Sequence, residues 1–265
     1  LANLNSQTSL GFDSAEYRGL NFGPTEVKVD VEKGQMHVRP FTTTVNNGKL
    51  NFAADADLSQ RPILLKTTGP LQAAQGIQIT EEMVGNFLQY VNPIFADAIG
   101  VSGAVTFETQ SLAIPLTAGF GSLAQLDGTI SIQELRLQAS LLNKILGGIK
   151  ESVKDQVLTI RPTKIALQNA VLRYDDMQID VGNNPINFGG AIGLDGILDM
   201  SVTLPYTYAG RTARVGEEGQ AGKRISVPLT GTLKAPQIDL QKLLQSQLQE
   251  QILGGLEELF KKSKK

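Results

Sequence analysis

Hydrophobic and polar residues alternate with a period of two along most of the chain. In residues 25–32, Val27, Val29 and Val31 alternate with charged side chains, and residues 50–58 repeat the pattern. Successive side chains of a β-strand point to opposite faces, so each such run predicts a strand with one apolar face. The apolar members of the later runs are Val105 and Phe107, Leu112 and Ile114, Ile130 and Ile132, Ile165 and Leu167, Met177, Ile179 and Val181, Ile186 and Phe188, Leu198, Met200, Val202 and Leu204, and Ile225, Val227 and Leu229.

Short turn signals separate these runs. Asn46-Asn47-Gly48 marks a hairpin, because asparagine and glycine tolerate a positive φ, and Asp195-Gly196 marks a turn in the second half. Many strands joined by short turns favour antiparallel pairing. The sequence therefore predicts a mainly β (α+β) fold, with a long twisted antiparallel sheet or groove and flanking amphipathic helices.

Three segments change to the spacing of an amphipathic helix. The first lies within residues 77–100, where Thr80 is the predicted N-cap and Asn92-Pro93 separates a second short helix over 93–99. The other two segments cover residues 141–153 and 240–260. Helices of this kind can cover the apolar face of a sheet.

The two halves of the chain carry matching residues in the same order. The matches are Pro24-Thr25 with Pro162-Thr163, Asn46-Asn47 with Asn183-Asn184, Asn51-Phe52 with Asn187-Phe188, Leu58 with Leu194, Pro70 with Pro205, Pro115-Leu116 with Pro228-Leu229, Gly128-Thr129 with Gly231-Thr232, and Ile145-Leu146 with Ile252-Leu253. We interpret them as two copies of a strand-plus-helix unit, over residues 1–161 and 162–265, with residues 77–100 inserted in the first. Such units cannot bury their apolar faces alone, so we expect one continuous sheet.

Composition removes several classes of function. The 265 residues include no cysteine and one histidine, His37, which excludes disulfides, cysteine nucleophiles and histidine-rich metal sites. A formal net charge of −2 and an aromatic content of 6% argue against nucleic-acid binding. With 41% hydrophobic and 19% charged residues, the chain is too apolar for a disordered protein.

Candidate catalytic groups lack the context that catalysis needs. Residues 119–124 fit the G-x-G-x-x-A pattern of a dinucleotide site, but a strand pattern follows where a helix should begin. His37 has no nucleophile motif to serve, and Asp55 and Asp57 share a strand face without a cleft around them. We therefore expect no enzymatic activity, no cofactor and no metal site.

The apolar strand faces admit two interpretations. They form either a core covered by the helices or the floor of an open groove that holds the acyl chains of a phospholipid or another lipid. A small tubular module with a closed lipid pocket and a structural β-scaffold without ligand are further alternatives. The candidate lipid-binding residues, which repeat on equivalent strands, are Leu50, Phe52, Phe107, Ile114, Ile186 and Phe188.

The C-terminus adds a local cluster of positive charge. Phe260 at the end of the third predicted helix is followed by Lys261, Lys262, Lys264 and Lys265. Each lysine near an anionic membrane surface contributes roughly 1 kcal/mol of attraction. Lysines also stabilise the C-terminus of a helix, so contact with a membrane surface and a solvated tail are alternative interpretations.

The strand that closes the second copy has a recognisable pattern. It reads Pro-Leu-x-Gly-Thr, then x-x-Pro-x-Ile, and an amphipathic helix follows. The residues at these positions are Pro228, Leu229, Gly231, Thr232, Pro236 and Ile238. This arrangement, over residues 225–260, resembles the C-terminal region of AsmA-like proteins, which are related to TamB-type periplasmic lipid bridges. The first copy keeps only part of the pattern and lacks a counterpart of Pro236.

The resemblance implies a function and a location. It implies a non-enzymatic envelope protein of diderm bacteria that guides phospholipid acyl chains along an apolar β-groove in outer-membrane biogenesis. It also implies a periplasmic location, as the C-terminal part of a protein anchored in the inner membrane. No catalytic residues come with this resemblance.

Overall fold

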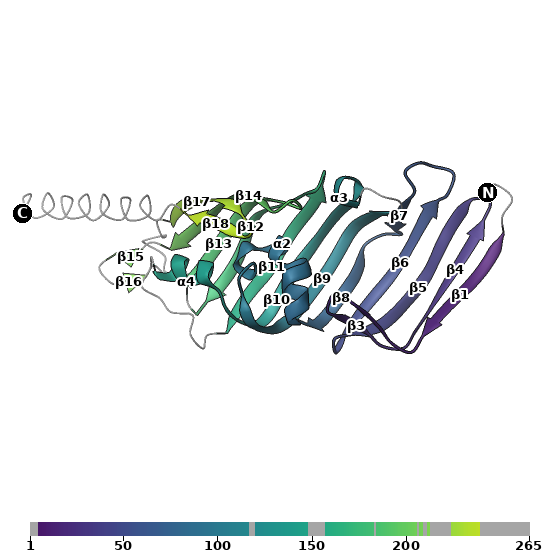
Figure 1. The fold of residues 1–265 in the computed structure, drawn as a ribbon, viewed down its shortest axis with the longest axis horizontal. Helices are drawn as coiled ribbons and strands as arrows, with labels where there is room; N and C mark the ends of the chain where they lie inside the picture. Colours follow the sequence, from purple (N-terminus) through teal and green to yellow (C-terminus); the bar gives the residue numbers. More distant parts are fainter. Residues whose placement is uncertain are drawn as a thin grey trace, which may run out of the picture.

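One antiparallel sheet of 16 strands dominates the fold (Figure 1). The computed structural model describes residues 5–116, 120–147, 157–182, 184–205, 207–208, 211–212 and 224–238. The predicted mainly β fold with a long antiparallel sheet is confirmed.

The strands follow one another across the sheet nearly in chain order, β1-β4-β5-β6-β7-β9-β10-β11-β12-β13-β14-β17-β18. β8 pairs with β6 and β9, and the β2–β3 hairpin joins β5 through β3. A separate pair comprises β15 (Thr207–Tyr208) and β16 (Arg211–Thr212). The bounds in the large sheet are β1 (Ser6–Phe12), β2 (Ala15–Tyr17), β3 (Leu20–Phe22), β4 (Thr25–Glu32), β5 (Gln35–Val45), β6 (Gly48–Asp57), β7 (Leu64–Thr67), β8 (Leu71–Gln78), β9 (Ile99–Pro115), β10 (Gln125–Gln138), β11 (Leu158–Gln168), β12 (Val171–Val181), β13 (Asn184–Gly193), β14 (Ile197–Pro205), β17 (Arg224–Thr232) and β18 (Ala235–Ile238).

Tight turns of two residues join neighbouring strands. Asn46 and Asn47 link β5 to β6 with φ values of 42° and 64°, which confirms the predicted hairpin. Lys33 and Gly34 link β4 to β5 with φ values of 50° and 83°. Two successive positive φ values are typical of the turn whose twist matches that of the strands it connects.

The β5–β6 and β12–β13 hairpins have the same geometry. Phe41 pairs with Phe52 in the first hairpin, and Met177 pairs with Phe188 in the second. In both hairpins the register shifts immediately beyond this pair, on the side away from the turn. The sequence match between Asn51-Phe52 and Asn187-Phe188 therefore corresponds to equivalent positions in two similar hairpins.

The matches near the ends of the two units differ in geometry. Pro115 ends β9 and Gly128 lies in β10, whereas Pro228 and Gly231 both lie in β17. In the first unit, the longer segment between Pro115 and Gly128 allows the chain to reverse direction and start a new strand. In the second unit, only two residues separate Pro228 from Gly231, so both stay in the same strand. The boundary at residues 161 and 162 falls inside β11, so the sheet continues through it.

The predicted helical insertion folds as four short helical segments. They are α1 (Glu81–Met83), the π-helical η1 (Val84–Leu88), α2 (Gln89–Val91) and the 3₁₀-helical η2 (Pro93–Phe95). Thr80 caps α1 as predicted, because its hydroxyl accepts a hydrogen bond from the Met83 amide at 3.3 Å. The second helix ends earlier than predicted, since β9 already pairs with β10 from Ile99 onward.

A further helix, α4 (Ser140–Gly147), begins the predicted 141–153 segment. The Asp97 carboxylate accepts a hydrogen bond from the Ser140 amide at 3.1 Å and so joins the start of α4 to the helical insertion. The rest of that segment, the predicted third helix and its Lys tail lie outside the described residues.

These helices pack on one face of the sheet, over β9 to β13 (Figure 1). α2 contacts β13, and the Asn92 amide nitrogen lies 3.5 Å from the sulfur of Met177 on β12. The insertion of the first unit therefore covers strands of the second unit. The largest fully buried side chains at this interface include Phe95, Phe188, Ile94, Ile132, Leu135, Leu142 and Ile145.

Candidate functional site

All six candidate lipid-binding residues lie on one face of the sheet. Directly opposed residues of an antiparallel pair share a face, so cross-strand pairs trace that face from strand to strand. Leu50 pairs with Ala74, Ala74 with Phe107, and Phe107 with Ile130. Phe52 lies two residues from Leu50 on β6 and shares its face.

The same pairing reaches the other three candidates. Leu126 and Ile130 lie four residues apart on β10, and Leu126 pairs with Leu112 on β9. Ile114, two residues beyond Leu112, is therefore on this face. From Ile132 on β10 the face continues through successive partners to β13, namely Ile160, Ile179, Ile186 and, two residues later, Phe188.

Burial divides the six residues into two groups. Ile186 and Phe188 lie under the helices and have 0% of their surface exposed. In this structure they are core residues, because the helical insertion packs directly on their strand. Leu50, Phe52, Phe107 and Ile114 are partly exposed.

Beyond the helical layer the apolar face continues over β1, β4, β5 and β6, where Figure 1 shows no described helix. We call this region the open apolar strip. Its two alanines, Ala54 and Ala56, are buried, and Leu50 packs against the margin of the hydrophobic core. The large apolar side chains of the strip are not among the buried members of that core. They are Leu10, Phe12, Val27, Val29, Val31, Met36, Val38, Phe41, Leu50 and Phe52.

Small residues form the floor of the strip on β6. Ala54 pairs with Val38 and is 0% exposed, and Ala56 pairs with Met36. Beside them, the rings of Phe41 and Phe52 stand with centroids 6.0 Å apart. The short alanine side chains make the surface lower there than at the phenylalanine pair.

Gly190, on β13 beside Phe188, has a backbone role. Its φ is +125°, and a Cβ atom would lie 2.4 Å from the Asp199 carbonyl oxygen of β14. A side chain is excluded by the close approach of the two strands, so this glycine is explained by strand packing.

Sequence reasoning missed several residues of the strip, notably Leu10, Met36, Val38 and Phe41. The register shift between Val38 and Phe41 interrupts the period of two in β5 and hides the shared face. In β1, Leu10 and Phe12 are the only large apolar residues. Apolar and polar residues alternate in both strands, but the shared apolar face can be identified only when the partner strands are known.

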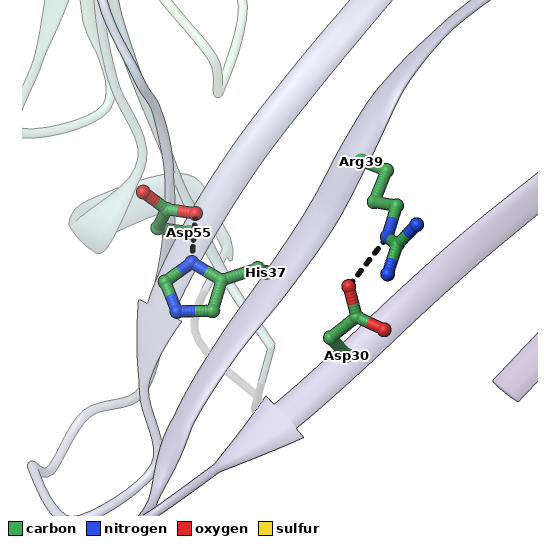
Figure 2. Close-up of polar contacts among 4 residues, drawn as sticks. All are labelled: Asp30, His37, Arg39 and Asp55. Carbon is green, nitrogen blue, oxygen red and sulfur yellow. Dashed lines mark hydrogen bonds and ion pairs between the residues drawn. The ribbon is translucent and has the colours of Figure 1, made fainter. Parts of the chain in front are cut away.

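The opposite face of the same strands is charged and solvent-exposed. Figure 2 shows two contacts there: Nδ1 of His37 lies 2.7 Å from Oδ1 of Asp55, and Nε of Arg39 donates to Oδ2 of Asp30 at 2.5 Å. The hydrogen bond to Asp30 raises the pKa of Arg39 above its usual value. Water screens exposed pairs of this kind, so they contribute little to stability. The strands are thus charged on one face and apolar on the other.

The two aspartates of β6 do not form the close carboxylate pair that acid–base catalysis uses. Asp55 contacts His37, whereas the Asp57 carboxylate accepts hydrogen bonds from the Ser59 hydroxyl at 2.6 Å and the Ser59 amide at 2.9 Å. These two bonds lower the pKa of Asp57 below its usual value. Asp57 therefore serves the turn that follows β6.

The dinucleotide-like segment likewise has a local structural role. The four-residue helix α3 (Phe120–Leu123) leads directly into β10, so no longer helix follows the glycines. Within the described ranges, no group of three or more acidic or histidine side chains gathers as metal ligands do. Among the same residues, no helix has the length and apolar character needed to cross a bilayer.

No protein-family model, curated protein or solved structure matches the chain. The resemblance to AsmA-like proteins therefore stays a prediction.

Proposed function

We propose that this chain is a non-enzymatic lipid-handling protein that holds phospholipid acyl chains on the open apolar strip. The observation that carries this proposal is the continuation of one apolar sheet face past the helices that cover it. Headgroups would stay in water at the margin of the strip. The resemblance to AsmA-like proteins supports a place in the bacterial envelope and a role in outer-membrane biogenesis.

The physical basis is ordinary hydrophobic contact. Strands lie about 4.8 Å apart, so the four strands of the strip cover roughly 15–20 Å. An acyl chain on this surface removes apolar area from water at about 25 cal/mol per Å². No covalent bond forms or breaks, so lipids can bind, slide and leave reversibly.

Two features separate this proposal from its alternatives. In the described part of the chain β1 and β18 lie at opposite ends of the strand order, which favours an open surface over a closed tubular pocket. The full burial of Ile186 and Phe188 favours a purely structural role for the helix-covered half. Lipid contact is therefore assigned to Leu50, Phe52 and the strip around them. Membrane contact through Phe260, Lys261, Lys262, Lys264 and Lys265 stays a prediction outside the described residues.

Lipid uptake by strip variants tests the proposal. Val29→Asp and Phe52→Asp each place a negative charge on the strip, and Gln75→Asp places the same charge on an exposed site of β8 as a control. The assay is binding of phosphatidylglycerol with a pyrene-labelled acyl chain, beside native mass spectrometry of the purified chain. A thermal melt by circular dichroism establishes that each variant is folded.

The expected result is lipid binding by the wild type and the Gln75→Asp variant and its loss in both strip variants. Binding that persists in folded Val29→Asp and Phe52→Asp would move the site elsewhere. A wild-type chain that purifies empty and takes up no labelled lipid would favour the scaffold interpretation.

A further inference from the structure

The two ends of the main strand order, β1 and β18, are built differently. At one edge, β18 has four residues, includes Pro236 and directly follows Lys234. Short length, proline and lysine are the features by which natural sheets prevent their edges from pairing with other strands. β18 is therefore protected against addition of another strand.

The other edge, β1, has none of these features. Its seven residues pair with β4 in unbroken register from Ser6 to Phe12, without a bulge. The strand contains no proline and no charged residue. In the described part of the chain no strand lies on its outer side. Among the described residues, the backbone groups that alternate away from β4 face no neighbouring strand and can accept a further one.

The apolar face also reaches this edge. Leu10 pairs with Val27, and 65% of the Leu10 surface is exposed. Phe12 lies two residues further along the same face of β1. An added strand would therefore gain apolar contacts as well as backbone hydrogen bonds.

We propose that β1 pairs with β1 of a second copy of this chain, antiparallel and about a two-fold axis at Ser9. This register pairs all seven residues of each strand. It keeps the apolar faces of both copies on the same side, with Thr8 opposite Leu10 and Ser6 opposite Phe12 across the interface. The strand is neutral, so no like charges meet.

The assembly ends at two copies. A two-fold interface uses the same surface of both chains and closes on itself. Along the main strand order of the described residues, the ends left free in the dimer are the two protected β18 strands. The dimer would join the two open apolar strips into one surface, but its formation does not depend on lipid binding.

The oligomeric state of the full chain tests the proposal. Sedimentation velocity over a concentration series should detect a reversible monomer–dimer equilibrium in lipid-free buffer. In the Thr8→Lys/Leu10→Lys variant, lysines face each other twice across the interface, which should weaken the dimer at least about tenfold. Both side chains are exposed in the single chain, so folding is expected to be retained.

A matched control and a covalent test complete the design. Ala235→Lys/Gln237→Lys adds the same charge at exposed positions of β18 and should leave the dimer unchanged. Because the chain has no cysteine, Ser9→Cys introduces a single thiol near the axis. Opposed Cα atoms in such a pair lie about 4.5–5.5 Å apart, within the range of a disulfide.

Mild oxidation of Ser9→Cys should give a disulfide-linked dimer, and Gln237→Cys should not. A chain that is monomeric at every concentration and does not cross-link would overturn the proposal. A dimer that persists unchanged in Thr8→Lys/Leu10→Lys, with no cross-link through Ser9→Cys, would place the interface elsewhere and overturn it equally. Neither outcome bears on lipid uptake, so the two proposals fail separately.

Discussion

Phe52 and Phe188 form a natural matched pair for measuring what the helical layer contributes. They occupy equivalent positions in two similar hairpins, and each follows an asparagine. Phe188 is 0% exposed beneath the helices, whereas Phe52 lies partly exposed on the open apolar strip. Replacing each by alanine therefore makes the same chemical change in two environments.

The expected losses of stability differ. Phe188→Ala removes a fully buried ring and leaves a cavity under the insertion, which costs about 3–5 kcal/mol in the free energy of unfolding. Phe52→Ala loses only part of the roughly 1.5–3 kcal/mol for burying a phenylalanine, and water can fill the gap. Phe52→Ala also removes the ring contact with Phe41, whose centroid lies 6.0 Å away. The total loss in the free energy of unfolding should be about 1–2 kcal/mol.

Urea denaturation followed by far-UV circular dichroism measures both losses. The wild type and the two variants are compared by transition midpoint and slope, and a shared slope allows the free energies to be compared directly. Equal losses at the two positions would refute the reasoning, because they would mean that the helical layer does not distinguish the two hairpins. A larger loss at Phe52 would mean that the strip is covered in solution.

Three further predictions concern single sites. Gly48→Ala should destabilise the fold by about 1–3 kcal/mol in the same urea titration, because a Cβ atom would lie 2.5 Å from the Ile77 amide nitrogen. The control Gly69→Ala, with open space around the new Cβ atom, should be neutral or stabilising. Tyr174→Phe should change the free energy of unfolding by less than about 1 kcal/mol, because the buried hydroxyl has no well-aligned hydrogen-bond partner among the described residues. Burial also raises the pKa of this hydroxyl. A loss of stability well above this value would reveal a partner. Ser59→Ala should move the pKa of Asp57 upward toward its usual value in a carboxyl NMR titration, and an unchanged pKa would show that the hydroxyl does not matter. The folded-state pKa of Asp57 is lowered, so its contribution to stability is present above the unfolded-state pKa and is lost as the pH falls through the folded-state value.

Local features of the fold were predictable because their causes are local. The hairpin at Asn46-Asn47 and the cap at Thr80 depend on backbone conformation and on side chains within a few residues. The alternation of apolar residues indicated the strands for the same reason. The register shift in β5 was not predictable, because it is defined relative to β6, the strand opposite.

In the candidate site, too, local features were predictable and long-range ones were not. Alternation placed Leu50 and Phe52 on an apolar face, and the structure puts them on one face with the other candidates. It did not indicate that Leu10, at the edge of the sheet, extends that face. This extension follows from the pairing of β1 with β4, a contact between segments that are separated in sequence.

The sequence by itself determined which side chains of each strand point together, because a period of two is a property of the extended backbone. The tertiary structure decided which part of the resulting apolar face is core and which is open. Asn51-Phe52 and Asn187-Phe188 are locally alike, yet only Phe188 is fully buried. The helical insertion that follows β8 packs across β9 to β13 and reaches the β5–β6 turn, where the Asn46 amide nitrogen lies 3.2 Å from the Met83 sulfur. It leaves Val38 and Phe52 outside the buried core. That choice depends on contacts between distant segments, such as Asn92 with Met177, which no local pattern encodes.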